Sequence, residues 1–179
     1  MHIAPPAPGS DFGFYNTYVF KTGSTELVTA LNANLNELKN LVKSLTEDQL
    51  LCRYEPGKWS IKEMLQHLVD AERNFCYRAM RISRKDQAPL PMFDIHQFVM
   101  NSHADERSTA NMMEEWELLR KTTILMFENM HPDMLDLTGP ARDVTVSVRA
   151  LGFAIAGHTI HHMTIIKEKY LPASVLAAQ

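Results

Sequence analysis

Two histidines one helical turn apart are the side chains of this sequence best placed to do chemistry. They belong to the segment Gly157-His158-Thr159-Ile160-His161-His162, inside an otherwise apolar run from Val148 to Tyr170 that contains no proline. At about 100° per residue, His158 and His162 lie only about 40° apart on a helix. The apolar residues that share this face are Leu151, Ile155, Ile165 and Ile166. A helix that buries this face therefore buries both imidazoles.

Buried imidazoles need partners, and a shared metal ion is the simplest partner for two of them. A third candidate ligand is His67, at the edge of the apolar face of an earlier predicted helix. Three imidazoles without a carboxylate suit Zn²⁺ or Ni²⁺ better than Mg²⁺ or Ca²⁺. Three protein ligands also leave one coordination position open, as in catalytic zinc sites, where bound water has a pKa lowered toward neutrality.

The sequence allows other interpretations of these histidines. All three could be core residues that only form hydrogen bonds. His161 lies about 60° to the other side of His158, at the flank of the apolar face, and is interpreted as a supporting or surface residue. The remaining histidines sit in loops or polar segments and are expected to be solvated: His2, His96, His103 and His131.

Other catalytic patterns do not fit. The zincin pattern HExxH fails because Thr159 stands where the glutamate would be. There is no GxSxG, no P-loop and no GxGxxG. Cys76 is predicted on the back of its helix, away from His67. Asp70 and Asn74 lie on the polar flank of His67, and Asp70 is the one carboxylate nominated as a general base, although a solvated helix face explains both residues equally well.

Four amphipathic helices are predicted to position these side chains, at about residues 24–45, 60–85, 108–130 and 147–170. The second begins with a capping box, Ser60 and Glu63, and Ser24, Ser108 or Thr109, and Ser147 are the other expected caps. A short helix is possible over 94–101, and residues 144–146 are locally extended. Four such helices with little strand signal predict an all-α, four-helix bundle. The long link between the second and third helices favours an up-down-down-up topology.

One domain over residues 1–179 is expected, with an irregular aromatic arm over 1–23 and a tail over 172–179. The chain has 179 residues, 45% hydrophobic and 22% charged, which is typical of a globular domain. The net charge of −3 without a basic block disfavours nucleic-acid binding. Two cysteines, Cys52 and Cys76, are too few for a disulfide framework. Without a signal-peptide pattern or an apolar run of about 20 residues, we expect a cytoplasmic protein that does not enter the membrane.

Three stretches of the sequence resemble the DinB/YfiT-like superfamily of metal-binding four-helix bundles. Residues 57–72 resemble its "W-S…H-L-x-D" helix, and the segment Gly157-His158-Thr159-Ile160-His161-His162 resembles its C-terminal "G-H-x-x-H-H". Between them stands Val148-Arg149-Ala150-Leu151. The resemblance spans nearly the whole chain, and the three motifs together, in this order and spacing, are more specific than any one alone.

The resemblance implies a metal site, a homodimer and a small-molecule substrate. The family's ligands fall on His67, His158 and His162, the same residues that the helical wheel selects. Characterised relatives include thiol S-transferases that use bacillithiol or mycothiol. A metal-dependent hydrolase, with Asp70 as base, is an alternative. A second alternative is a non-catalytic metal- or ligand-binding protein of the stress response, whose site would be closed by His161 or an acidic side chain.

Overall fold

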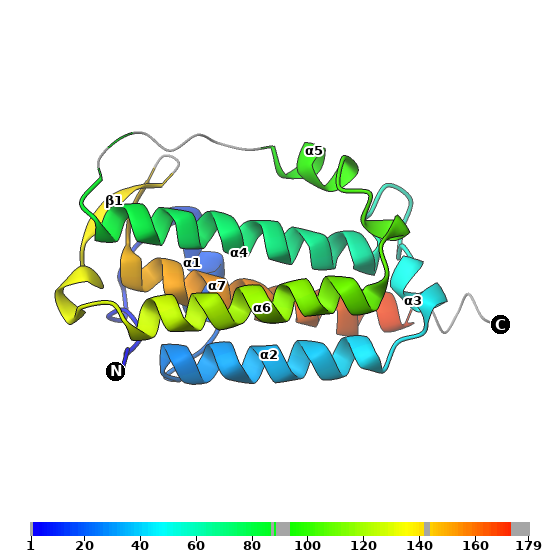
Figure 1. Ribbon diagram of the computed structural model, residues 1–179, viewed down its shortest axis with the longest axis horizontal. Coiled ribbons are helices and arrows are strands. Elements are labelled where there is room, and N and C mark those ends of the chain that lie inside the picture. Colours follow the sequence, from blue (N-terminus) through cyan, green and yellow to red (C-terminus); the bar gives the residue numbers. More distant parts are fainter. Residues whose placement is uncertain (1, 87, 89–93, 142–143, 173–179) are drawn as a thin grey trace.

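Four long helices make up the body of the protein. The computed structural model describes residues 2–86, 88, 94–141 and 144–172. The long helices are α2 (Leu27–Lys43), α4 (Ile61–Ser83), α6 (Thr109–Glu128) and α7 (Val148–Ile165). They lie side by side along the longest axis of the molecule (Figure 1). The predicted all-α, four-helix bundle is confirmed. Among the described residues, no helix is long and apolar enough to cross a membrane.

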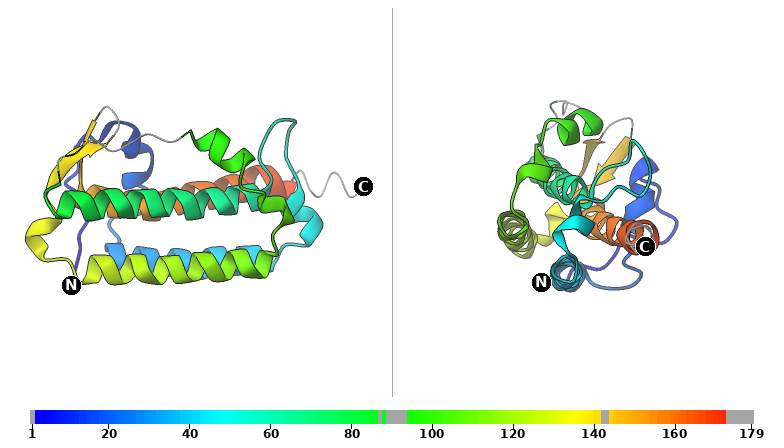
Figure 2. Two further views of the ribbon diagram at one scale, coloured as in Figure 1. Left: turned by 45° about the horizontal axis from the view of Figure 1, so that its top comes forward. Right: turned by 90° about the vertical axis from the view of Figure 1, so that its right-hand side faces the viewer.

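The helices run up, down, down and up, as predicted. In Figure 1, α2 and α7 run in one direction and α4 and α6 in the other. Each helix packs against two neighbours, so that α4 contacts α7 and α6, while α2 contacts the same two helices from the opposite side (Figure 2, right). Because α4 and α6 are parallel, the chain must return along the bundle between them. This crossover carries α5 (Ile95–Met100) over the outer side of α4.

Side-chain caps define where the long helices begin. Ser60 caps α4 through the backbone nitrogen of Glu63, whose carboxylate accepts from the Ser60 backbone in return. Ser108 and Ser147 cap α6 and α7. These starts confirm the predicted caps. The prediction for α2 was wrong by two residues: Glu26, not Ser24, is the cap, because its carboxylate accepts from the backbone of the first turn and also from Ile3 of the arm.

Short elements complete the chain. The bounds are η1 (Gly13–Tyr15), α1 (Asn16–Val19), α3 (Glu47–Leu51), η2 (Ala104–Glu106), η3 (Pro132–Met134) and the π-helical turn η4 (Ile166–Tyr170). Strands β1 (Thr138–Ala141) and β2 (Val144–Ser147) pair antiparallel, with Thr138 opposite Ser147. The extended segment was predicted, but its partner strand was missed. The predicted tail lies, from residue 173 on, outside the described residues.

The N-terminal arm covers α7 and is more regular than predicted, since it contains η1 and α1. Helix α1 packs on α7, and Gly157 is where the two backbones meet. A Cβ at Gly157 would collide with the backbone carbonyl of Tyr18, so only glycine permits this approach. Because the arm lies on one side and α4 and α2 on others, residues 150–159 are buried without interruption.

A polar layer divides the core into two hydrophobic clusters, one toward each end of the bundle. Part of this layer is the ion-pair cluster, formed by Glu72, Arg120, Thr159 and the carbonyl of Leu31. The Arg120 guanidinium is fully buried and donates to both Glu72 carboxylate oxygens, at 2.8–3.1 Å. It also donates to Leu31 O at 3.2 Å and to Thr159 Oγ1 at 2.9 Å. The ion-pair cluster thus ties all four long helices together.

Candidate metal centre

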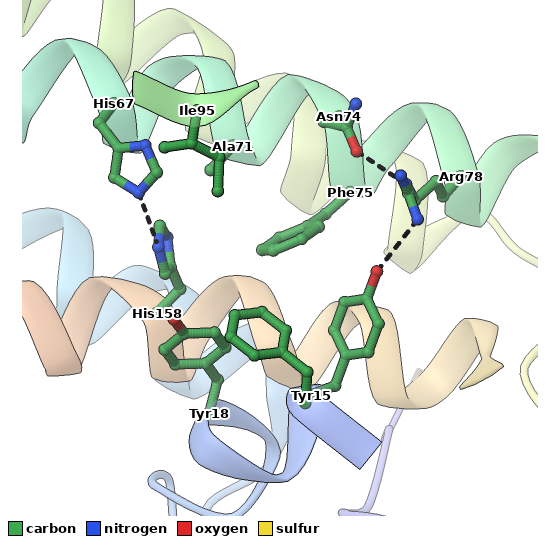
Figure 3. Close-up of a pocket in the computed structure, with 10 residues that line it drawn as sticks. Tyr15, Tyr18, His67, Ala71, Asn74, Phe75, Arg78, Ile95 and His158 are labelled. Carbon is green, nitrogen blue, oxygen red and sulfur yellow. Dashed lines mark hydrogen bonds between the residues drawn. The ribbon is translucent and has the colours of Figure 1, made fainter. Parts of the chain in front are cut away.

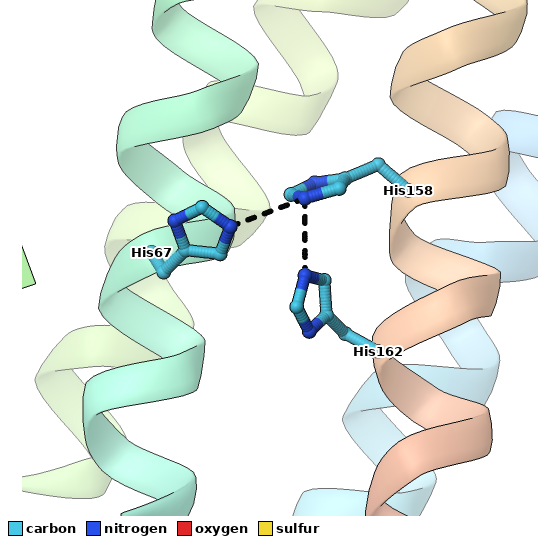
Figure 4. Close-up of side chains that lie close together, drawn as sticks. All are labelled: His67, His158 and His162. Atoms are coloured by element: carbon cyan, nitrogen blue, oxygen red, sulfur yellow. Dashed lines mark hydrogen bonds between the residues drawn. The ribbon is translucent and has the colours of Figure 1, made fainter. Parts of the chain in front are cut away.

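The three predicted ligands meet in the middle of the bundle. His67 lies on the second turn of α4, and His158 and His162 lie one turn apart on α7, which packs against α4. Their imidazoles point toward one another across the helix interface (Figure 4). We call these three residues the histidine cluster. It belongs to the same polar layer as the ion-pair cluster.

The ring nitrogens of the histidine cluster converge as metal ligands would. His158 Nε2 lies 3.1 Å from His67 Nε2 and 3.0 Å from His162 Nε2. Around a tetrahedral zinc ion with Zn–N distances of about 2.0–2.1 Å, ligand nitrogens lie about 3.3 Å apart. The observed spacing is therefore close to that of a ligand set. Among the described residues, these three histidines are the one group of three or more His, Cys, Asp or Glu side chains whose ligand atoms lie close enough together to hold a metal ion.

Hydrogen bonds alone do not satisfy this arrangement. A neutral imidazole nitrogen either donates one proton or accepts one through a single lone pair. His158 Nε2 faces two other Nε2 atoms at hydrogen-bonding distance, so it can make a full hydrogen bond to only one of them. His162 Nδ1 is buried and has no hydrogen-bond partner among the described residues. A cation that draws one lone pair from each ring removes the conflict among the Nε2 atoms, so the donor set fits a divalent ion.

Burial keeps the imidazoles uncharged. The exposed fractions of His67, His158 and His162 are only 6%, 5% and 7%. Desolvation lowers the pKa of His67 to about 4. It also holds the pKa values of His158 and His162 well below their usual range, and the neighbouring imidazoles add to the shift. At neutral pH all three rings are neutral and offer their lone pairs.

Two cavities flank the histidine cluster. The first has about 520 Å³ of empty volume, including solvent at its mouth, and reaches His67 and His158. Figure 3 shows its aromatic walls: Tyr18 meets the His158 ring edge-on at 4.9 Å, and Phe75 lies 5.8 Å from the same ring. A side chain of the N-terminal arm therefore shapes the approach to the cluster.

The second cavity lies on the other side, at His162. It has about 630 Å³ of empty volume and is lined by Trp59 and His96 among others. The Trp59 ring also lies 5.0 Å from that of His67, so the residue just before the α4 cap helps to enclose the cluster. Neither cavity is lined by a carboxylate from the described residues. The histidine cluster is thus open on two sides without an adjoining acid.

The other sequence candidates lie outside the cluster. The ring of His161 is half-buried and packs 5.1 Å from that of His162 and 5.5 Å from that of Tyr18, which fits a supporting position. The Asp70 carboxylate accepts from Gln66 at 3.1 Å and lies 3.8 Å from Arg73, so these contacts stay on α4 and do not reach the imidazoles. Burial raises the pKa of the Cys76 thiol to about 12, which disfavours the thiolate that a nucleophile needs.

Sequence reasoning missed Arg78, which lines the first cavity at the end opposite His67. The signal was present: Arg78 follows His67 by three helical turns, so the two residues lie about 20° apart on the wheel. It also missed Tyr18 as a cavity wall. Nothing in the sequence says which helix the aromatic arm covers.

Comparison with known proteins bears on the same residues. The sequence profile of the DinB superfamily matches residues 30–166, most of the chain and all three histidines. The chain belongs to the DinB superfamily. Among curated relatives, a candidate metal-dependent hydrolase of Oceanobacillus iheyensis is 22% identical over 146 residues, which cover 79% of this chain and 82% of the relative.

A second relative is known in both sequence and structure. The candidate metal-dependent hydrolase YfiT of Bacillus subtilis is 26% identical over 143 residues, covering 74% of this chain and 75% of YfiT. The YfiT structure, described as an unusual four-helix bundle, superposes with a TM-score of 0.70 and covers 90% of this chain and 91% of YfiT. Identity over that superposition is 14%, so this structural match speaks for the fold alone.

Proposed function

We propose that this protein is a divalent-metal-dependent hydrolase whose ion is held by His67, His158 and His162. One observation carries the proposal: three uncharged imidazoles aim their Nε2 atoms at one point between two cavities. The relatives, named as candidate metal-dependent hydrolases, support the same reaction class. Zn²⁺ or Ni²⁺ suits an all-imidazole ligand set best.

The open face of the histidine cluster favours catalysis over a structural role. A structural zinc site has four protein ligands, whereas this cluster offers three. A divalent ion bound there supplies Lewis acidity, polarising a carbonyl or phosphoryl oxygen and lowering the pKa of water. The chain's own residues hold the ligand geometry, and the aromatic rings of Tyr18, Phe75 and Trp59 limit water around it. The described cavity walls provide no carboxylate base, so we do not assign that role to Asp70.

Metal content and hydrolysis test the proposal together. Protein purified without chelator should hold about one Zn or Ni ion per chain by elemental analysis, and His158→Ala should hold none. The wild type, but not His158→Ala, should hydrolyse members of a panel of esters and amides, and chelation should abolish the activity until the metal is restored. His161→Ala is the matched control, because it changes a histidine of the same helix that lies outside the cluster.

A thiol-transferase activity is tested by a second assay on the same metal-loaded protein. If the metal-loaded protein leaves all esters and amides intact but conjugates a low-molecular-weight thiol to a chlorinated aromatic, the reaction is S-transfer and the hydrolase proposal is wrong. If it binds no stoichiometric metal, the metal site itself is wrong. A metal-binding protein inactive in both assays would be the non-catalytic bundle.

A further inference from the structure

Arg78 is a buried cation at the far end of the first cavity. Its exposed fraction is 3%, and it lines the cavity on α4 together with Asn74. Its partners are neutral: Nε donates to Asn74 Oδ1 at 2.7 Å, and Nη1 donates to the hydroxyl of Tyr15 at 3.2 Å. Within the described residues, no carboxylate lies within ion-pairing distance of it. This differs from Arg120, the other deeply buried arginine, which is paired with Glu72.

A buried guanidinium without a counter-charge is costly, because its neutral hydrogen-bond partners do not replace the solvation of a full charge. Such a group is stabilised when an anion enters the site. The unused N–H groups of Arg78 are available to that anion, since the described hydrogen bonds occupy Nε and Nη1 only.

The cavity places this cation at a fixed separation from the histidine cluster. Arg78 folds back toward the preceding turn, as its bond to Asn74 shows (Figure 3). Asn74 follows His67 by seven residues, which is roughly 10 Å along a helix at 1.5 Å per residue. Between the two ends lie Ala71 and the rings of Phe75 and Tyr18. The cavity is therefore polar at both ends and apolar in the middle.

We propose that the first cavity binds a small organic carboxylate with an aromatic or branched apolar body, with Arg78 holding the carboxylate. This inference rests on the proposed function for its consequence in catalysis: the bond to be hydrolysed lies at the histidine end, and the substrate's carboxylate lies at the other. Arg78 is then a specificity residue that sets which end of the substrate faces the histidine cluster.

Charge and shape favour a carboxylate over a phosphate. The described walls of the cavity offer one cation, so a monoanion is neutralised, whereas a phosphate dianion leaves a net charge among aromatic rings. The planar fork of a guanidinium also matches a carboxylate in a bidentate pair. The apolar walls add affinity for a ring or branched chain but none for a bare inorganic anion.

Binding to the metal-free protein tests this site independently of hydrolysis. The probes are hydrocinnamate and its uncharged amide, which share one apolar body, and inorganic phosphate. Titration calorimetry should show the acid binding on the order of tenfold or more tightly than the amide, as expected for a charge-assisted hydrogen bond. Arg78→Met should remove this preference and leave amide binding nearly unchanged. Arg73→Met, which removes a cation from the same helix outside the cavity, should retain the preference.

Three results would overturn the proposal: no binding of the acid, equal binding of acid and amide, or an Arg78→Met variant that keeps the preference. Phosphate that binds more tightly than hydrocinnamate would mean that the cavity is a phosphate site instead.

The stability of the Arg78→Met variant gives a separate readout. Removing an unpaired buried cation should leave the denaturation midpoint unchanged or raised, whereas a fall that Tyr15→Phe reproduces would make Arg78 a structural residue.

One further variant and one further assay keep the test decisive. Where Arg78→Met fails to fold, Arg78→Lys keeps the charge without the planar fork and should weaken acid binding severalfold. If the metal-loaded enzyme hydrolyses esters, hydrocinnamate should inhibit it competitively, and inhibition should need Arg78. If the enzyme hydrolyses nothing, the calorimetry still decides whether the cavity binds carboxylates, so failure of the hydrolase proposal is distinguishable from failure of the carboxylate site.

Discussion

The ion-pair cluster and the histidine cluster share α4 and α7, lie in the same polar layer and are both almost fully buried, yet their bonding differs. In the ion-pair cluster, opposite charges cancel, and Arg120 donates to Glu72, Thr159 and a backbone carbonyl. In the histidine cluster, His158 Nε2 faces two other Nε2 atoms but can form a full hydrogen bond to only one of them, and His162 Nδ1 has no hydrogen-bond partner among the described residues. The first cluster is complete within the protein, whereas the Nε2 atoms of the second are all satisfied only by a shared cation.

The two clusters also differ in whether they line a cavity. Cavities open at His67, His158 and His162, whereas the residues of the ion-pair cluster line neither of them. Buried polar groups that satisfy one another make a core more specific, and those left short of partners mark a binding site. The two clusters share helices, burial and depth. What distinguishes the structural cluster from the candidate binding site is whether the buried polar groups find enough hydrogen-bond partners within the protein.

The largest effect should come from breaking the ion-pair cluster. Arg120→Met leaves the Glu72 carboxylate buried without a partner, and we expect the free energy of unfolding of the metal-free protein to fall by about 3–5 kcal/mol. The double variant Glu72→Leu, Arg120→Met removes both charges and should recover most of that loss. Urea denaturation measures both. A single variant no less stable than the double would contradict the view that this cluster is structural.

Metal should stabilise the protein through the histidine cluster alone. At a free Zn²⁺ concentration a hundredfold above Kd, binding to the folded state should raise the free energy of unfolding by about 2.7 kcal/mol. His158→Leu, which replaces the ring by an apolar side chain of similar size, should lose this gain. Without metal it should cost less than about 1.5 kcal/mol. A metal-free loss as large as that of Arg120→Met would mean that the histidines, too, form a structural cluster.

Thr159 tests whether adjacent residues of α7 serve different clusters. Thr159 Oγ1 accepts from Arg120, and its neighbour His158 belongs to the histidine cluster. Thr159→Val should therefore cost about 1.5–3 kcal/mol of stability, the usual contribution of a hydrogen bond to a charged group, and leave metal affinity unchanged. Thr164→Val on the exposed side of the same helix is the control and should cost less. Loss of metal affinity in Thr159→Val would show that the clusters are coupled.

How much of this could be predicted follows from the range of the forces involved. The caps and apolar faces of α4, α6 and α7 are set by residues close together in the sequence. Ser60 and Glu63 therefore indicate a helix start without knowledge of the tertiary structure. The angle between His158 and His162 is equally local. Their meeting with His67 needed the bundle topology, which the long crossover favoured and the family resemblance supported.

Three features of the structure could not be predicted from the sequence, because each depends on contacts between distant segments. Gly157 indicates a close backbone approach but not that Tyr18 makes it, and this contact brings the Tyr18 ring to the cavity. The partner of β2 was missed because β1 contains Gly139 and Pro140, which local rules assign to a turn. Arg78 shares the helix face of His67, but sequence alone does not show that its hydrogen-bond partners among the described residues are the neutral side chains of Asn74 and Tyr15.

The smallest expected effect concerns His161, and it marks the outer limit of the histidine cluster. Burial and the nearby Lys21 lower its pKa, so its ring is also uncharged and able to coordinate a metal. Its position differs: it packs beside His162 and Tyr18 and is not among the converging side chains. We therefore expect His161→Gln to change the Zn²⁺ dissociation constant by less than about twofold and stability by less than about 0.5 kcal/mol, as for most surface substitutions. Competition with a fluorescent chelator measures the constant. A tenfold loss would make His161 a fourth ligand, close the open position and turn the comparison around, because the histidine cluster would then be as complete as the ion-pair cluster beside it.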